Sequence, residues 1–488
     1  MGSNSVNDGK GPKISVDLHN LTGIEVPTRA DKPAFLRKVD WRIVPITFLC
    51  YLMNLIDKVA LNYAVVMGLT KDLGLTGDDF SNTATVFFAA YLIAEIPTAF
   101  ILTKVPVAKY LAFNVLLWGI ASACTAAAHN YHTLLTARIF LGIFEAPIAP
   151  CLMLISSQWY TKREQGTRFA FWYCGLGFGQ MIGGIISFAF QHINKHDFQG
   201  WRIMFVVIGC VTEIIGLATI FVLPDSPKSA QFFSEAEKDA ILGRVSMNRT
   251  EVSTRRFELA QVWEALLDVQ VWLLALMTIL PSISSGVVTT YSATLIKNLG
   301  FSLRIAALLN MPSGAVSIAS TLIVGYGVQH WSHRWAWYVA SCVPGIIGGG
   351  LMSFLPIYNR GGLLVGVWLV NCVVPTVLIT YQLTAANVAG HTKRAFSTTL
   401  MAAAFGIGNI IGPQTFQARD APQYIPAKIT VLTTQGTGAV LAVILFGYYW
   451  WCNLRRNREN QQVDVQDAME RHLNDVTDKR DGRFQYVL

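Results

Sequence analysis

An arginine and a glutamate interrupt the apolar run ARIFLGIFEAP at residues 137–147. Arg138 and Glu145 are seven residues apart, about two turns of an α-helix, so their side chains would share one helix face about 10 Å apart. Ionisable side chains inside a membrane helix are costly unless they are paired, hydrated or turned into the protein interior. The pair therefore predicts either a functional site inside a membrane bundle or a structural ion pair between neighbouring helices.

A second charged pair, Asp57 and Lys58, lies in the first apolar segment, within NLIDKVALNYA. It comes about 14 residues, or roughly 21 Å, after the start of that segment, at about the depth that Arg138 would have in the fourth. We therefore expect Asp57, Lys58 and Arg138 to share one layer, with Glu145 about 10 Å deeper. The four formal charges sum to zero, which limits the cost of burying them.

These four side chains have the composition of a site for an anion and a proton. Lys58 and Arg138 would hold an anionic group, since a desolvated carboxylate needs fixed positive charge and hydrogen-bond donors. Asp57 and Glu145 would carry protons. The cation beside Asp57 favours its ionised form, whereas desolvation favours the protonated form of Glu145.

Twelve apolar segments would position these side chains. The chain has 488 residues, 52% of them hydrophobic and 14% charged, and a mean hydropathy of +0.41, which is too apolar for a soluble protein of this length. Because about 20 helical residues cross a bilayer, we predict an all-α polytopic membrane protein with twelve transmembrane helices in two six-helix pseudo-repeats. The segments are 43–67, 82–103, 107–128, 131–155, 166–190 and 201–223, then 271–295, 304–327, 335–357, 361–386, 394–416 and 428–452.

The basic residues are distributed unequally between the loops. Of 38 Lys and Arg residues, 28 fall on the side that carries both termini and 8 on the other side, while Lys58 and Arg138 lie inside segments. Basic loops remain in the cytoplasm, so we expect both termini there, in a multi-pass protein of the plasma membrane. Topology then explains the formal net charge of +8, and no nucleic-acid partner is expected.

Motifs of other protein classes are missing from the sequence. None of the eight cysteines forms a CxxC pair, so we expect neither a metal site nor a disulfide framework. The absence of GxxxxGK[ST], HExxH and GxSxG motifs argues against an enzyme, a bound cofactor and an ATP-driven pump. A channel would need a ring of repeated filter groups, which one asymmetric charge cluster does not provide.

Polar stretches divide the chain into five predicted parts. Ser234 and Glu237 predict a capping box that opens a short amphipathic helix, ending near Met247. The parts are a disordered cytoplasmic arm without a cleaved signal (1–42), an N-terminal six-helix bundle (43–223), a cytoplasmic linker with that helix (224–270), a C-terminal six-helix bundle (271–453) and a cytoplasmic tail (454–488).

Further polar side chains inside the segments are candidate ligands. Tyr91 is either a hydrogen-bond donor to a substrate or a packing residue, and Gln180 needs partners for its amide within a glycine-rich stretch that lets helices approach closely. The second half is neutral, and its candidates are Tyr291, Asn387 and Asn409. A neutral half facing a charged half would suit a substrate with one anionic end and a polar body.

The combination of these motifs resembles the major facilitator superfamily, and within it the anion:cation symporter family and its fungal allantoate-permease-like branch. The resemblance covers residues 35 to 455. Besides the two charged pairs it rests on GWR at Gly200, LPDSP at 223–227, NVAGHTKR at 387–394 and GNIIGPQ at 408–414. One departure is Lys58, since arginine often follows the acidic residue in this family.

The resemblance implies a proton-coupled symporter of a small organic anion, such as allantoate or a vitamin acid, that works by alternating access as a monomer. It also implies that acidic residues of the first and fourth segments take up protons, that basic residues hold the anion, and that Gln180 contacts substrate. The alternative is an exporter of a fungal secondary metabolite on the same fold.

Overall fold

The fold is described from a computed structural model of the chain. It describes residues 34–102, 104–160, 168, 171–191, 199–226, 229–230, 233–234, 237–238, 241, 258–331, 333–421, 423–459, 477–482 and 484–488. Most of the predicted N-terminal arm, and most of the amphipathic helix predicted to end near Met247, lie outside the described residues. Ser234 and Glu237 make the reciprocal bonds of a capping box, from Ser234 N to Glu237 Oε2 (3.0 Å) and from Glu237 N to Ser234 Oγ (3.3 Å).

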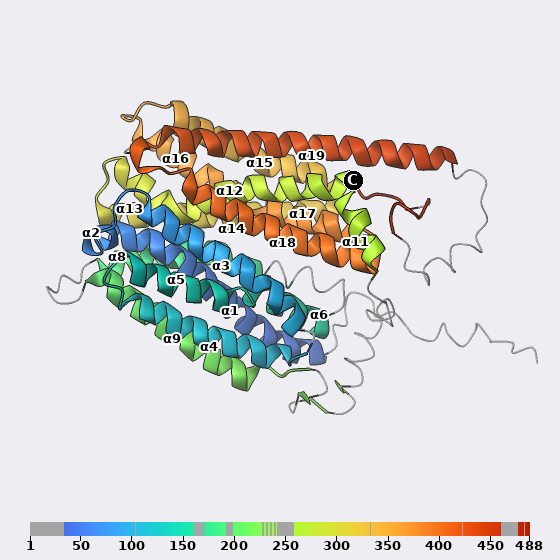
Figure 1. Cartoon of the computed structure of the whole chain (residues 1–488), viewed down its shortest axis with the longest axis horizontal. Helices are drawn as coiled ribbons and strands as arrows, with labels where there is room; N and C mark the ends of the chain where they lie inside the picture. The colour runs from blue at the N-terminus through green and yellow to red at the C-terminus, as the bar shows by residue number, and fades with distance from the viewer. Residues whose placement is uncertain are drawn as a thin grey trace, which may run out of the picture.

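The described residues are helical wherever they form regular structure, and the helices fall into two groups along the chain (Figure 1). The first group is α1 (Ala34–Val66), α2 (Leu69–Asp72), α3 (Asp79–Ile101), α4 (Val107–Thr125), α5 (Tyr131–Glu145), α6 (Ile148–Trp159), α8 (Gly175–Phe190) and α9 (Gly200–Val222). We call it the N-half.

The second group begins with α11 (Leu259–Leu266) and ends with the last long helix, and we call it the C-half. It contains α12 (Val269–Asn298), α13 (Leu303–Leu309), α14 (Met311–Trp331), α15 (Arg334–Phe354), α16 (Arg360–Val370), η3 (Asn371–Val373), α17 (Val374–Asn387), α18 (His391–Gln414), η4 (Ala418–Asp420) and α19 (Ile425–Glu459).

The predicted membrane fold is confirmed. Within the described residues, eleven helical stretches are long and apolar enough to cross a membrane. The second predicted segment is α3, whose 23 residues span about 34 Å and which packs against α5 and α18. It lies outside the set of eleven, and a twelfth span formed by α3 stays a prediction.

Prolines break the spans that surround the centre of the bundle. Since proline lacks a backbone N–H and its ring clashes with the preceding turn, Pro147 separates α5 from α6 immediately after Glu145. Pro312 lies at the junction of α13 and α14, and Pro375 follows η3. The charged fourth span is therefore two helices rather than one, and Glu145 is the last residue of the first.

Glycines let the fifth span (α8) and the eleventh span (α18) pack closely against neighbouring helices, and they do so in corresponding ways in the two halves. A Cβ on Gly179 would lie 3.0 Å from Leu55 of α1, and a Cβ on Gly412 would lie 2.6 Å from the carbonyl oxygen of Ile283 in α12. Other glycines of the same two helices face the opposite half. A Cβ on Gly177 would lie 2.5 Å from the Gly314 carbonyl oxygen of α14, so α8 and α14 touch through their backbones.

The two halves are joined at one end of the bundle. We call the end at which α1 begins and α19 finishes the terminal end, and the opposite end the far end. Hydrogen bonds between the halves gather at the far end, where Asn62 Nδ2 donates to Ser292 Oγ (2.9 Å) and Gln414 Nε2 donates to Thr85 Oγ1 (2.8 Å). In Figure 1, α2 and α13 lie at the far end, whereas α6 and α11 lie at the terminal end.

Candidate functional site

A glutamate, a lysine and an asparagine form the buried charged centre of the bundle. Glu145, at the end of α5, is fully buried, and its Oε1 lies 2.9 Å from Lys58 Nζ of α1. Asn54 Nδ2 donates to the same oxygen (2.8 Å), and Lys58 Nζ donates to Asn54 Oδ1 (3.0 Å). The second carboxylate oxygen, Glu145 Oε2, has no hydrogen-bond partner among the described residues. One carboxylate oxygen thus holds the cation while the other is free to take a proton.

Asp57 does not belong to this centre, although it precedes Lys58 in the chain. Successive side chains on a helix point about 100° apart, and the fully buried Asp57 accepts a hydrogen bond from Ser122 Oγ of α4 (2.5 Å). Asp57 thus faces the third span, whereas Lys58 reaches Glu145 (2.9 Å), which was expected about 10 Å deeper than the layer of Asp57, Lys58 and Arg138. The charge of Asp57 still acts on Arg138, together with that of Glu145.

Arg138 is buried with hydrogen-bonding capacity left over. Its side chain is 2% exposed, and no acceptor among the described residues reaches its Nε or Nη2 atoms. The guanidinium carbon lies 5.9 Å from the centre of the Phe87 ring. Arg138 and Lys58 line one small cavity together with Thr289 and Thr290 of the C-half. A buried guanidinium with open donors beside a cavity can bind a carboxylate in bidentate fashion.

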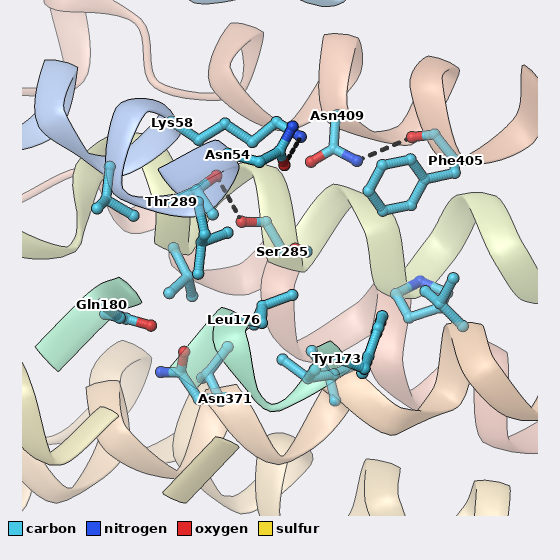
Figure 2. A pocket seen from close by; sticks show the side chains of 18 of the residues that line it. Asn54, Lys58, Tyr173, Leu176, Gln180, Ser285, Thr289, Asn371, Phe405 and Asn409 are labelled. Atoms are coloured by element: carbon cyan, nitrogen blue, oxygen red, sulfur yellow. Dashed lines mark hydrogen bonds between the residues drawn. The ribbon is translucent and has the colours of Figure 1, made fainter. Parts of the chain in front are cut away.

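A larger cavity continues from Lys58 between the two halves. Figure 2 shows its polar side chains, which come from α1, α8, α12, η3 and α18. Asn409 Nδ2 donates to the Phe405 carbonyl oxygen (2.9 Å), so its Oδ1 remains as an acceptor. The cavity is charged on the side of α1 and neutral elsewhere. The polar residues that line it include Asn54, Lys58, Tyr173, Gln180, Ser285, Thr289, Asn371 and Asn409.

Gln180 and Tyr91 occupy different positions relative to this cavity. Gln180 lines it, and its Nε2 donates weakly to Asn310 Oδ1 (3.5 Å). Tyr91 lines neither cavity, and its ring lies 5.3 Å from Lys58 Nζ. Tyr91 therefore stabilises the Lys58 ammonium through a cation–π contact and does not line the cavity itself.

Tyr291 and Asn387 lie away from the cavity. At the far end, Tyr291 Oη is 2.5 Å from Ser81 Oγ, and its ring stacks on Phe416 at 4.2 Å, so it belongs to the contact that closes that end. The amide of Asn387 is used at the terminal end, where it bonds both backbone groups of Val487. Neither residue lines either of the two described cavities.

Several lining residues were missed in the sequence, although one had a readable signal. Asn54 precedes Lys58 by four residues and therefore lies on the same face of α1. Ser285 and Thr289 show the same spacing on α12. Hydroxyl residues are common in membrane helices, so nothing in the sequence distinguishes these two from residues that bond their own backbone, as Thr289 Oγ1 does with the Ser285 carbonyl oxygen (2.9 Å).

Several known transporters are similar to this chain in sequence. The sequence pattern of the Major Facilitator Superfamily matches residues 47–413. The Thiamine pathway transporter of Saccharomyces cerevisiae is 35% identical over 459 residues, which cover 93% of this chain and 86% of that protein. The Allantoate permease of the same yeast is 28% identical over 484 residues, covering 95% of this chain and 88% of the permease.

Solved structures with the same fold are much less similar in sequence. A bacterial homolog of the human lysosomal transporter Spinster, in an inward-facing and unoccupied conformation, is 16% identical with a TM-score of 0.60, covering 86% of this chain and 97% of that one. A D-xylose-proton symporter is 14% identical with a TM-score of 0.62, covering 83% and 97%. At these identities the likeness concerns the fold alone.

Proposed function

Because this chain belongs to the Major Facilitator Superfamily and is a multi-pass membrane transporter rather than an enzyme, we propose that it carries a small organic anion together with a proton by alternating access. The observation that supports this proposal most directly is the buried Lys58–Glu145 pair at 2.9 Å, whose lysine lines the small cavity together with an arginine that has unused donors.

Lys58 and Arg138 are the proposed anion ligands. Both line the small cavity, and a carboxylate placed there would receive the open Nε and Nη2 donors of Arg138 as a planar fork. The Lys58 ammonium would have to leave Glu145 or share its donors between two carboxylates. Binding of the anion therefore competes with the existing ion pair.

A proton on Glu145 resolves this competition. The charges of Asp57, Lys58, Arg138 and Glu145 sum to zero, so an added monoanion leaves the buried site at minus one, which is costly in a low-dielectric interior. Protonation of Glu145 returns the sum to zero and releases Lys58 for the anion. The expected stoichiometry is one proton per monoanion, which makes the transport electroneutral. Asp57 is the second, less direct proton site.

The transport cycle follows from the contacts at the two ends. The structure has the far end closed by bonds such as that of Ser81 with Tyr291. In the proposed orientation both termini are cytoplasmic, so the terminal end faces the cytoplasm and the structure is the inward state. Release of anion and proton there re-forms the Lys58–Glu145 pair, which leaves a neutral carrier able to return empty. We place the carrier in the plasma membrane and expect a monomer to be sufficient.

The C-half suits a substrate with a polar body. Asn371, Asn409 and Ser285 offer neutral donors and acceptors opposite the charged α1. Two relatives carry substrate or pathway names, allantoate and thiamine. Allantoate is an anion with several amide groups, whereas thiamine is a cation. Because the open donors of Arg138 repel cations, the allantoate type of substrate is the one that the site favours.

The test is uptake of radiolabelled allantoate, nicotinate, pantothenate and thiamine into cells that lack endogenous carriers, with and without a proton uncoupler. We expect at least one anion to accumulate, accumulation to collapse with the uncoupler, and thiamine to be excluded. Measuring efflux from preloaded cells determines direction. Accumulation of thiamine but of no anion, or anion accumulation insensitive to the uncoupler, would contradict the proposal.

A further inference from the structure

The final residues of the chain are bound in a groove at the terminal end of the C-half. Tyr486 is 4% exposed, and its ring stacks on Tyr449 of α19, with centres 4.9 Å apart and an interplanar angle of 12°. Asp478 is fully buried and accepts a hydrogen bond from Tyr486 Oη (3.0 Å). A charged stretch that the sequence predicts to be a solvated tail is thus packed against the bundle. We call the described residues 477–482 and 484–488 the strap.

Two asparagines form hydrogen bonds to the strap backbone in the same way. Asn387 of α17 donates to the Val487 carbonyl oxygen (2.9 Å) and accepts from the Val487 N–H (2.7 Å). Asn453 of α19 donates to the Tyr486 carbonyl oxygen (2.8 Å) and accepts from the Tyr486 N–H (2.9 Å). Each amide bonds both the N–H and the C=O of one strap residue, as a residue of a neighbouring β-strand would. After a turn at residues 477–481, the groove therefore binds the backbone of Tyr486 and Val487.

A buried lysine forms the centre of the groove. Lys393 at the start of α18 is fully buried, and its Nζ lies 2.7 Å from Asp268 Oδ2, 3.1 Å from Glu264 Oε1 and 2.8 Å from Asp478 Oδ1 of the strap. Burial raises the pKa of Asp268, but the hydrogen bonds and charge of Lys393, with Gln270, outweigh it and place the pKa below its usual value. The cluster is therefore ionic.

The strap completes the charge balance of this cluster. Without it, one lysine faces two carboxylates, and the sum is minus one. The strap adds the carboxylate of Asp478 and two cations, since Lys479 Nζ lies 3.1 Å from Asp268 Oδ1 and Arg480 Nε lies 3.5 Å from Glu264 Oε2. The sum becomes zero. Loss of the strap would leave an uncompensated buried charge, which is strongly unfavourable.

The strap also holds the turn between α17 and α18. Gly390 has φ +90°, and a Cβ there would lie 2.9 Å from Thr477 Cγ2 and 2.8 Å from Gln261 Oε1 of α11. In Figure 1, α11 and α18 lie on the side of the C-half that faces the N-half, α19 lies on the opposite side, and the chain end lies between them. The strap thus connects α11 and α18, which must approach the N-half during closure, to α19 on the opposite side of the C-half.

We propose that the strap is a releasable peptide ligand of this groove and that its docking holds the terminal end of the transporter open. Docking and opening are then coupled: whatever displaces the strap shifts the carrier toward the state closed at the terminal end. In the sequence, residues 460–476 connect α19 to the strap.

Docking is tested with the full chain carrying a site for a specific protease between residues 468 and 469. After purification and cleavage, mass spectrometry measures how much strap fragment remains bound. We expect retention in the otherwise unchanged chain and in Gln485→Ala, which loses only an exposed hydrogen bond to Asn457 Oδ1 (2.9 Å), and loss in Tyr486→Ala and in Asp478→Asn. Fragment loss from the unchanged chain as rapid as from these variants would overturn the proposal.

Coupling to opening is tested in the uncleaved chain with Ser285→Cys, a position that lines the cavity. The rate of maleimide labelling at position 285, read by peptide mass spectrometry, reports access from the open end. We expect Asp478→Asn to lower this rate by roughly threefold or more, as a shift in a two-state population, and Gln485→Ala to leave it unchanged. Suppose that Asp478→Asn loses its strap fragment in the cleavage experiment but shows an unchanged labelling rate in the uncleaved chain. The strap would then be only structural, without an effect on opening.

Discussion

Replacing Glu145 by glutamine isolates the proton from the anion. Glutamine has nearly the same shape, and its Oε1 can still accept from Asn54 and Lys58, whose bonds to Glu145 are 2.8 and 2.9 Å long. The variant therefore keeps the packing of a protonated glutamate and removes the negative charge permanently. We expect it to bind the anion and exchange it, but to lose accumulation driven by a proton gradient.

The size of the effect follows from the geometry of the pair. An anion that shares the Lys58 ammonium with Glu145 would lie about 4 Å from that carboxylate, where like charges repel by about 4 kcal/mol at an effective dielectric constant of 20. Water in the cavity screens part of this repulsion. We therefore expect affinity for the anion at mildly alkaline pH to rise by about tenfold, or about 1.4 kcal/mol, and to become independent of pH.

The assay is binding of a radiolabelled anion to purified protein between mildly acidic and mildly alkaline pH, with counterflow and gradient-driven uptake in proteoliposomes. The matched control is Glu213→Gln on α9, which removes the charge of a side chain whose Cγ lies beside Gly119 of α4 and which lines neither described cavity. A Glu145→Gln variant that still concentrates the anion with normal pH dependence would refute the reasoning and make Glu145 a structural partner of Lys58.

Three further changes test other parts of the structure. Arg138→Lys keeps the charge but loses the planar fork, so we expect the half-saturating anion concentration to rise about tenfold in uptake assays, with exposed Arg304→Lys as control. Tyr291→Phe removes the bond to Ser81 (2.5 Å), and thiol labelling at the far end should become faster; an unchanged rate would remove Tyr291 from the closing contact. Gly177→Ala places a Cβ 2.5 Å from a carbonyl oxygen, so the melting temperature should fall by several degrees, whereas Gly325→Ala, with open space around it, should not change it.

The fold was readable from the sequence because a membrane imposes long apolar helices. Segment positions agree with the helices to within a few residues at most boundaries, and the differences have local causes. The first helix begins at Ala34, nine residues before the predicted segment, because it continues beyond its apolar part. Pro147 and Pro375 divide spans that hydropathy alone shows as continuous.

The site was only partly readable, because hydropathy gives depth and not direction. Lys58 and Glu145 were predicted to be functional from their charge, but their pairing at 2.9 Å depends on how α1 and α5 are rotated toward each other. Tyr291 and Asn387 lie near the ends of their spans, where a polar side chain serves closure or docking as readily as ligand binding. The strap was missed since its contacts are with residues far away in sequence, such as Lys393.

The glycine contact between α8 and α14 has a mechanical consequence. Where Gly177 meets Gly314, the two halves touch through backbone atoms beside the side chains of Ile318 and Met181, so few rotamers must change when one half tilts against the other. Tilting of one half against the other therefore needs little side-chain rearrangement at this contact. The contact is also intolerant of change, because a single methyl group would wedge the halves apart. Substitutions that change substrate preference are then restricted to the residues that line the cavities, while the glycine contact between the halves remains constant.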